Sequence, residues 1–213
     1  MPAKSVLNLI LNKGDHLQRE RGLLLRIWHW SNMLVVFGLL ATVFARDAFF
    51  KVKKNAQFFD NVAVTKGYAL DPNVSLALAR ESKDRFWAVH VWLGYIFCFL
   101  LVLRCVSIFE SQKKTAPQEP RSLRLLYNLA YGIFIIMALS GLTLNLSANL
   151  NLSTDVHDWT HSLHEWGFRF VLGFAVLHLL GVLRAELGKQ PGIVSQMIHG
   201  KKLQQIQNAA KKD

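Results

Sequence analysis

Four apolar stretches of about 20 residues each constrain the fold of this chain more than any other feature of its sequence. They cover about residues 27–46, 86–108, 125–146 and 163–183, and polar, charged segments separate them. A helix rises about 1.5 Å per residue, so each stretch is long enough to cross the roughly 30 Å hydrocarbon core of a bilayer. We therefore predict an all-α fold, an integral membrane four-helix bundle.

The segments around the spans divide the sequence further. Residues 1–22 are polar and basic and lack the apolar core and cleavage site of a secretory signal, so we expect a cytoplasmic lead-in and a retained first span. Residues 23–188 hold the four spans as one domain, and residues 189–213 form a basic tail that we expect in the cytoplasm. In the first connection, Asp71 and Pro72 predict the start of a helix, which we expect to lie on the membrane surface.

The formal net charge of +11 could indicate a nucleic-acid-binding protein, but its distribution indicates a membrane protein instead. Sixteen of the 25 lysine and arginine residues lie in residues 1–26, 104–124 and 184–213, which share one side of a four-span topology. The third connection, residues 147–162, has none. Because basic residues accumulate on the cytoplasmic side of spans, we expect cytoplasmic termini, surrounding membrane lipid and no nucleic-acid partner.

Four histidines lie within the apolar stretches, where ionisable residues are rare and usually face a bundle interior or a cofactor. His164 and His178 are fourteen residues apart, so they point about 40° apart and lie roughly 21 Å apart along the fourth span. In antiparallel spans, His29 lies at the depth of His178, and His90 lies at the depth of His164. His161 would point about 100° away from His178 and is the poorer partner.

Two facing imidazoles at each level fit the axial positions of a haem iron, which would shuttle electrons because both axial positions are filled. A zinc or copper site would need three or four converging ligands, whereas these histidines divide two and two. A lone histidine in a span could also serve only as a hydrogen-bonding group for a neighbouring helix. Covalent attachment of c-type haem is excluded, because the sequence has no C-x-x-C-H motif.

Glycines and arginines near the histidines are further candidates for cofactor contacts. Three glycines follow three of the histidines by three or four residues and would leave room for a flat macrocycle, although small residues also serve ordinary helix packing. These are Gly94, Gly167 and Gly181. Three arginines could pair with haem propionates. These are Arg26, Arg104 and Arg169.

Short motifs surround the four histidines: "RIWHW" at 26–30, "HVWLGY" at 90–95, and the H-x13-H pattern of the fourth span. Together they resemble the prokaryotic di-haem cytochrome b family, which is cytochrome b561-like and includes the membrane subunits of nickel–iron hydrogenases and formate dehydrogenases. The resemblance covers residues 23–188. It implies two haem b groups, with the four histidines as axial ligands in the pairs given above.

The resemblance also implies a function. Such proteins pass electrons between a periplasmic or membrane-associated redox subunit and the quinone pool, as part of a respiratory oxidoreductase complex in the bacterial inner membrane. Quinone is then the expected substrate, and Arg26, Arg104 and Arg169 are candidate contacts for quinone as well as for a propionate. Two alternatives stay open: a stand-alone membrane oxidoreductase acting on superoxide or quinone, and a haem-free membrane anchor or metal carrier.

Overall fold

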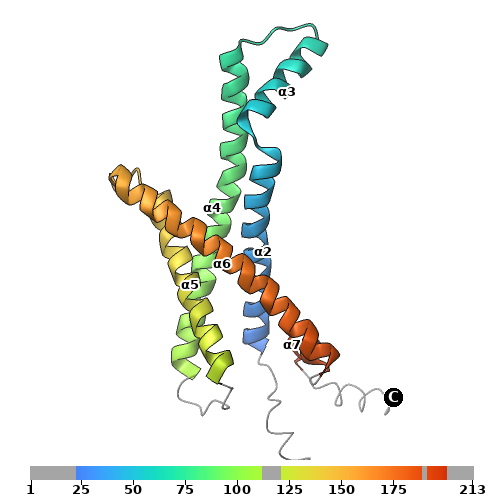
Figure 1. Ribbon diagram of the computed structural model, residues 1–213, viewed down its shortest axis with the longest axis vertical. Coiled ribbons are helices and arrows are strands. Elements are labelled where there is room, and N and C mark those ends of the chain that lie inside the picture. Colours follow the sequence, from blue (N-terminus) through green and yellow to red (C-terminus); the bar gives the residue numbers. More distant parts are fainter. Residues whose placement is uncertain (1–22, 112–120, 189–190, 201–213) are drawn as a thin grey trace, which may run out of the picture.

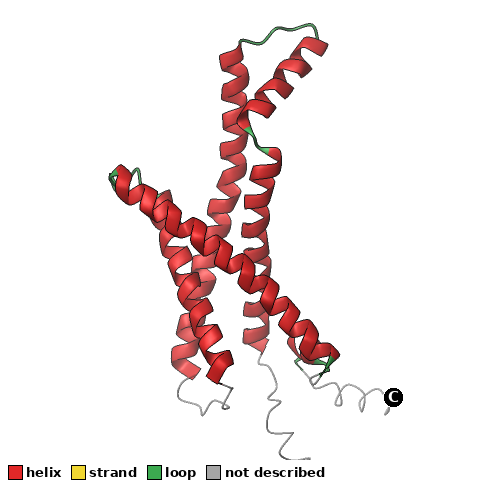
Figure 2. Ribbon diagram, viewed as in Figure 1, coloured by secondary structure: helices red, strands yellow, loops and turns green. Residues whose placement is uncertain are grey.

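The computed structural model describes residues 23–111, 121–188 and 191–200, and all regular structure in these residues is helical (Figure 2). The predicted lead-in at residues 1–22 and the tail beyond residue 200 lie outside the described residues. The helices are α2 (Leu23–Phe49), α3 (Val52–Thr65), α4 (Pro72–Ser111), α5 (Arg121–Asn145), α6 (Thr154–Leu187) and α7 (Ile193–His199).

Four of these helices are long and apolar enough to cross a membrane, which confirms the predicted all-α membrane fold. They are α2, α4, α5 and α6, and each corresponds to one of the four apolar stretches. Large apolar side chains point outward from them: Leu34, Phe99 and Leu177 are 66%, 63% and 64% exposed. Such a surface suits hydrocarbon surroundings, because a soluble monomer rarely exposes large continuous apolar patches.

The four spans pack as two antiparallel pairs, α2 with α4 and α5 with α6, and the pairs meet along α4 and α5. Figure 1 shows α6 running obliquely across α4 and α2. Where the pairs meet, the Phe134 ring of α5 makes edge contacts with Phe97 of α4 and Phe174 of α6, at centroid distances of 5.6 and 6.0 Å. These contacts form an apolar core between α4, α5 and α6.

Helix α4 has 40 residues and is about 60 Å long, so it extends well beyond a single membrane crossing. The helix begins at Pro72 as predicted, and the Asp71 carboxylate accepts a hydrogen bond from the Asn73 N–H at 2.7 Å. The expectation of a separate helix on the membrane surface is wrong, because α4 continues directly into the second span. No glycine or proline lies between Pro72 and Gly94 to interrupt the helix.

Helix α3 packs against the first turns of α4, and together they form a hairpin that projects beyond the other spans (Figure 1). We call residues 52–85 the outer hairpin. Small side chains allow close approach there: Ala56 is 6% exposed, and Ser75 and Ala79 are 0% exposed. The Ser75 hydroxyl also donates a hydrogen bond to the Asp60 carboxylate, which ties the two helices together.

Helix α7 is held against the end of the bundle opposite the outer hairpin (Figure 1). The Arg26 guanidinium and the Trp30 indole N–H donate hydrogen bonds to backbone carbonyls of α7, at 2.8 and 2.9 Å. The Glu186 carboxylate accepts hydrogen bonds from the N–H groups of Gly192 and Val194, at 2.9 and 3.0 Å. The start of α2 and the end of α6 therefore lie on the same side of the protein, as four antiparallel spans require.

Candidate functional site

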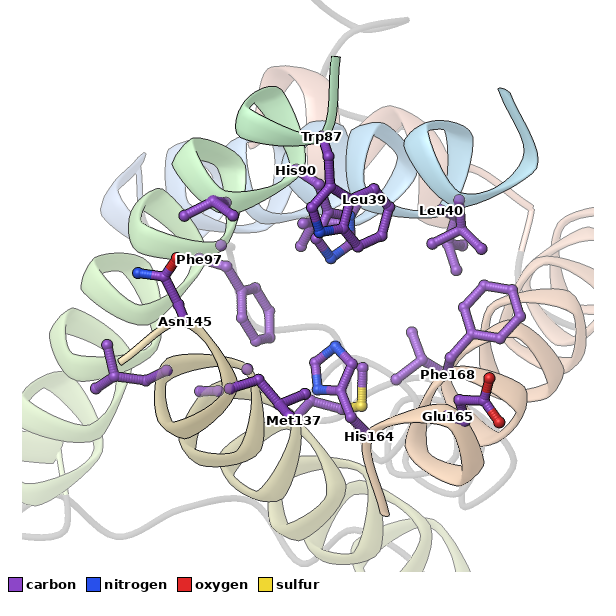
Figure 3. Close-up of a pocket in the computed structure, with 18 of the residues that line it drawn as sticks. Leu39, Leu40, Trp87, His90, Phe97, Met137, Asn145, His164, Glu165 and Phe168 are labelled. Carbon is purple, nitrogen blue, oxygen red and sulfur yellow. The ribbon is translucent and has the colours of Figure 1, made fainter. Parts of the chain in front are cut away.

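His90 of α4 and His164 of α6 face each other across a cavity, with ring centroids 6.5 Å apart and ring planes at 80° (Figure 3). A metal ion lies about 2 Å from a coordinating imidazole nitrogen, so two imidazoles that share one metal have centroids roughly 6 Å apart. The observed separation therefore leaves room for one metal ion between the two rings.

His29 of α2 and His178 of α6 form a second facing pair, with ring centroids 6.2 Å apart and ring planes at 60°. Aromatic neighbours support both rings: Trp30 meets His29 edge-on at 5.6 Å, and Phe174 stacks on His178 at 5.8 Å. This pair lies about 21 Å from the first along α6. The structure thus brings the four candidate histidines together in two pairs of similar spacing.

The first pair lies in a cavity of about 710 Å³, a size typical of pockets that bind cofactors. Its walls are largely apolar and come from all four spans (Figure 3). Wall residues include Leu39, Leu40, Phe97, Met137 and Phe168. Charged side chains line the cavity toward the outer hairpin, and they include Arg46, Asp47, Lys83 and Asp84. The apolar walls suit the macrocycle of haem, and the basic groups at this end, Arg46 and Lys83, are the ones that an anionic propionate would approach.

A hydroxyl group lies beside each ring of this pair. The Oγ1 atom of Thr42 lies 2.7 Å from Nδ1 of His90, and the Oγ atom of Ser140 lies 2.9 Å from Nδ1 of His164. Each hydroxyl comes from a span that does not carry the histidine it contacts, namely α2 and α5. Because Nδ1 is engaged in this way, Nε2 is the nitrogen of each ring that remains available to a metal.

The described residues contain no group of three or more histidine, cysteine, aspartate and glutamate side chains that could hold a metal ion. Cys98 and Cys105 are free thiols. A zinc or copper site requires three or four protein ligands, whereas haem supplies four equatorial nitrogens and needs only two axial ligands. The paired histidines and the cavity therefore fit haem better than a bare metal ion.

Residues 20–200 match a family model described as prokaryotic cytochrome b561, and this range contains all four spans. The chain belongs to the prokaryotic cytochrome b561 family. Membership confirms the resemblance seen in the sequence, and it means that this multi-pass membrane protein transfers electrons across the membrane through haem b. Neither a curated protein nor a solved structure matches the chain significantly.

The three glycines proposed to accommodate haem in this cytochrome b561 family member have different surroundings. Gly94 lines the cavity of the first histidine pair. A Cβ atom at Gly94 or at Gly181 would meet no heavy atom of the described residues within 4 Å, apart from the backbone of its own helix. A Cβ atom at Gly167 would collide with Sδ of Met137, so this glycine allows α6 to pack closely against α5.

Gly141 of α5 is a site residue that the sequence did not reveal. A Cβ atom there would lie 3.0 Å from Cε1 of His164, which is closer than an ordinary van der Waals contact. The absence of a side chain at Gly141 therefore makes room for the imidazole ring. In the sequence, Gly141 is far from every histidine. It follows Ser140 in the third span, and this position alone does not indicate contact with an imidazole ring.

Arg46 and Trp87 extend the site toward the outer hairpin, and the sequence did not single them out as site residues. The Trp87 indole stacks on the His90 ring at a centroid distance of 4.3 Å, with planes only 6° apart. The Arg46 guanidinium lies 4.7 Å from the centroid of the Trp87 ring and pairs with the Asp47 carboxylate at 2.9 Å. A tryptophan at the start of a span is typical of the interfacial aromatic belt, so its contact with His90 becomes visible only in the fold.

The three arginines predicted near the cofactor make different contacts. Arg26 binds a backbone carbonyl of α7. The Arg104 guanidinium lies 5.1 Å from the Trp28 ring, and the Arg169 guanidinium lies 4.6 Å from the Trp166 ring. Among the three, Arg169 is the one that lines the cavity of the first histidine pair. Arg169 therefore stays a candidate for a propionate or quinone contact.

Proposed function

We propose that the protein binds two b-type haems and uses them to carry electrons across the bacterial inner membrane. His29 and His178 ligate one iron, and His90 and His164 ligate the other. The observation that carries this proposal is the presence of two facing imidazole pairs, with centroids 6.2 and 6.5 Å apart, about 21 Å from each other along α6. One pair lies toward the outer hairpin and the other toward α7, so the two haems would lie in opposite leaflets of the membrane.

Haem supplies a one-electron couple at its iron when it is bound. The two imidazoles of each pair would hold the haem, and haem held by two imidazoles would carry electrons rather than bind oxygen. The contacts among Phe97, Phe134 and Phe174 continue the apolar interior from the cavity to His178, on which Phe174 stacks. These rings make the region between the two histidine pairs apolar.

We also propose that the electrons pass between a periplasmic or membrane-associated redox subunit and the quinone pool. A protein partner on the side of the outer hairpin is supported by two observations. The hairpin projects beyond the spans (Figure 1), and it carries exposed side chains. Phe58 and Val64 are 60% and 67% exposed there, and the neighbouring Lys53 and Lys54 are also exposed. The concentration of basic residues on the opposite side supports cytoplasmic termini.

The ligand assignment is tested by haem content in purified histidine variants. We expect His178→Ala to lose the haem near α7 and His164→Ala to lose the haem near the outer hairpin, so that each keeps one of two. His161→Ala is a matched control, because His161 also lines the cavity but its ring packs on His157 at 6.4 Å, and it should keep both haems. Two haems in His178→Ala, or a loss in His161→Ala, would overturn the assignment.

The role as a subunit is tested by purifying a tagged chain from membranes in mild detergent. We expect a redox subunit to accompany the chain and to deliver electrons through it to quinone. A chain that purifies alone and couples superoxide to quinone would contradict this part of the proposal and favour a stand-alone oxidoreductase. A purified chain without haem colour would instead favour a membrane anchor or metal carrier.

A further inference from the structure

We propose that the hydroxyls of Thr42 and Ser140 are positioning groups that hold His90 and His164 in the tautomer with hydrogen on Nδ1 and lower the reduction potential of the haem between them. This inference rests on the proposed function, since it concerns the haem assigned to that histidine pair. It adds two side chains, on spans α2 and α5, that touch the proposed ligands but would not touch the iron.

The two neighbours of the Thr42 hydroxyl determine whether Thr42 or His90 donates the hydrogen bond between them. Its Oγ1 atom lies 2.7 Å from the Leu39 carbonyl oxygen and 2.7 Å from Nδ1 of His90. A hydroxyl has a single hydrogen, and a carbonyl oxygen can only accept, so the Thr42 hydrogen goes to Leu39. Nδ1 of His90 must then donate its own hydrogen to Oγ1, which leaves Nε2 with a lone pair for a metal.

Ser140 repeats this arrangement on the opposite side of the cavity. Its Oγ atom lies 2.7 Å from the Ile136 carbonyl oxygen and 3.2 Å from that of Met137, and it lies 2.9 Å from Nδ1 of His164. The Ser140 hydrogen again points to the backbone, so Nδ1 of His164 donates and Nε2 is left as the coordinating nitrogen. Both rings are therefore prepared for coordination through Nε2.

Burial makes these hydrogen bonds effective. Thr42 is 7% exposed and Ser140 is 5% exposed, so water does not readily replace either hydroxyl. In a low-dielectric surrounding, a hydrogen bond from Nδ1 is stronger than in water and makes the opposite nitrogen a better electron donor. A better donor stabilises ferric over ferrous iron, and the potential of this haem falls as a result.

The test is a redox titration of the purified two-haem protein and its variants, followed by visible absorption. We expect Thr42→Val and Ser140→Ala each to raise the potential of one haem step and to leave the other step unchanged. A tenfold loss in the preference of the site for ferric over ferrous iron corresponds to a rise of about 59 mV for a one-electron couple. Thr42→Ser keeps the hydroxyl and should restore the wild-type potential.

Thr143→Val is the matched control for Ser140→Ala, because the Thr143 hydroxyl lies on the same helix and bonds to its own Leu139 carbonyl at 2.9 Å. It should leave both potentials unchanged. Haem loss in Thr42→Val that Thr42→Ser prevents would also support the positioning role, whereas equal loss in both would contradict it. Unchanged potentials in two-haem variants would overturn this inference alone, while fewer than two haems in the wild-type protein would overturn the proposed function.

Discussion

Gly141 gives the most direct residue-scale prediction, because its missing side chain makes room for the His164 ring. We expect the valine side chain in Gly141→Val to displace the His164 ring from its position facing His90 and to reduce the haem content from two to one. Gly132→Val is the control on the same helix, since a Cβ atom there would meet no heavy atom of the described residues within 4 Å, its own helix backbone aside. The measurement is haem per chain in both purified variants, and equal haem content in the two would contradict the role of Gly141.

The pairing of the four histidines could be predicted at the residue scale. A helix repeats every 3.6 residues, and the bilayer has a fixed thickness, so the sequence position of a residue in a span gives both its direction and its depth. Those two constraints led to the pairing of His164 and His178 with histidines on other spans. The contacts of Thr42 and Ser140 could not be predicted in this way. Hydroxyls in spans commonly bond to their own helix, as Thr143 does, and only the packed fold shows which of them also reaches a histidine.

At the scale of single elements, the buried contact between α3 and α4 gives a second prediction. Ala79 is 0% exposed, so a leucine there would overpack the outer hairpin at a cost of about 1–3 kcal/mol. We expect Ala79→Leu to speed proteolytic cleavage of the hairpin while both haem spectra stay unchanged. The exposed Ala77→Leu on the same helix should be cleaved like the wild-type protein. Equal cleavage of the two variants would contradict the close packing of α3 on α4.

The four spans could be predicted because crossing a bilayer imposes both length and apolar composition on a helix. Helix α3 lies outside the apolar stretches and was not predicted from hydropathy. Its signal is a weaker one: Val52, Ala56, Phe59 and Ala63 recur at helical spacing and form the less exposed side of α3. This pattern identifies the buried face of an amphipathic helix, but it does not show that α4 supplies the surface that covers it.

At the scale of the whole molecule, the proposed orientation predicts which surfaces are reachable from outside the cell. Asn61 is exposed on the outer hairpin, and His199 is exposed on α7 at the opposite end. We expect a membrane-impermeant thiol reagent to label Asn61→Cys in intact cells and to label His199→Cys only after lysis. The wild-type protein, which has Cys98 and Cys105, provides the background. The reverse labelling pattern would contradict cytoplasmic termini.

Two haems in one chain are the central claim for the molecule as a whole, because both histidine pairs have the spacing of an axially shared metal. The most direct measurement is the ratio of haem b to polypeptide in the purified wild-type protein, with haem determined as its pyridine complex and protein by amino-acid analysis. We predict two haems per chain. A ratio of one or less in fully folded protein would contradict the account.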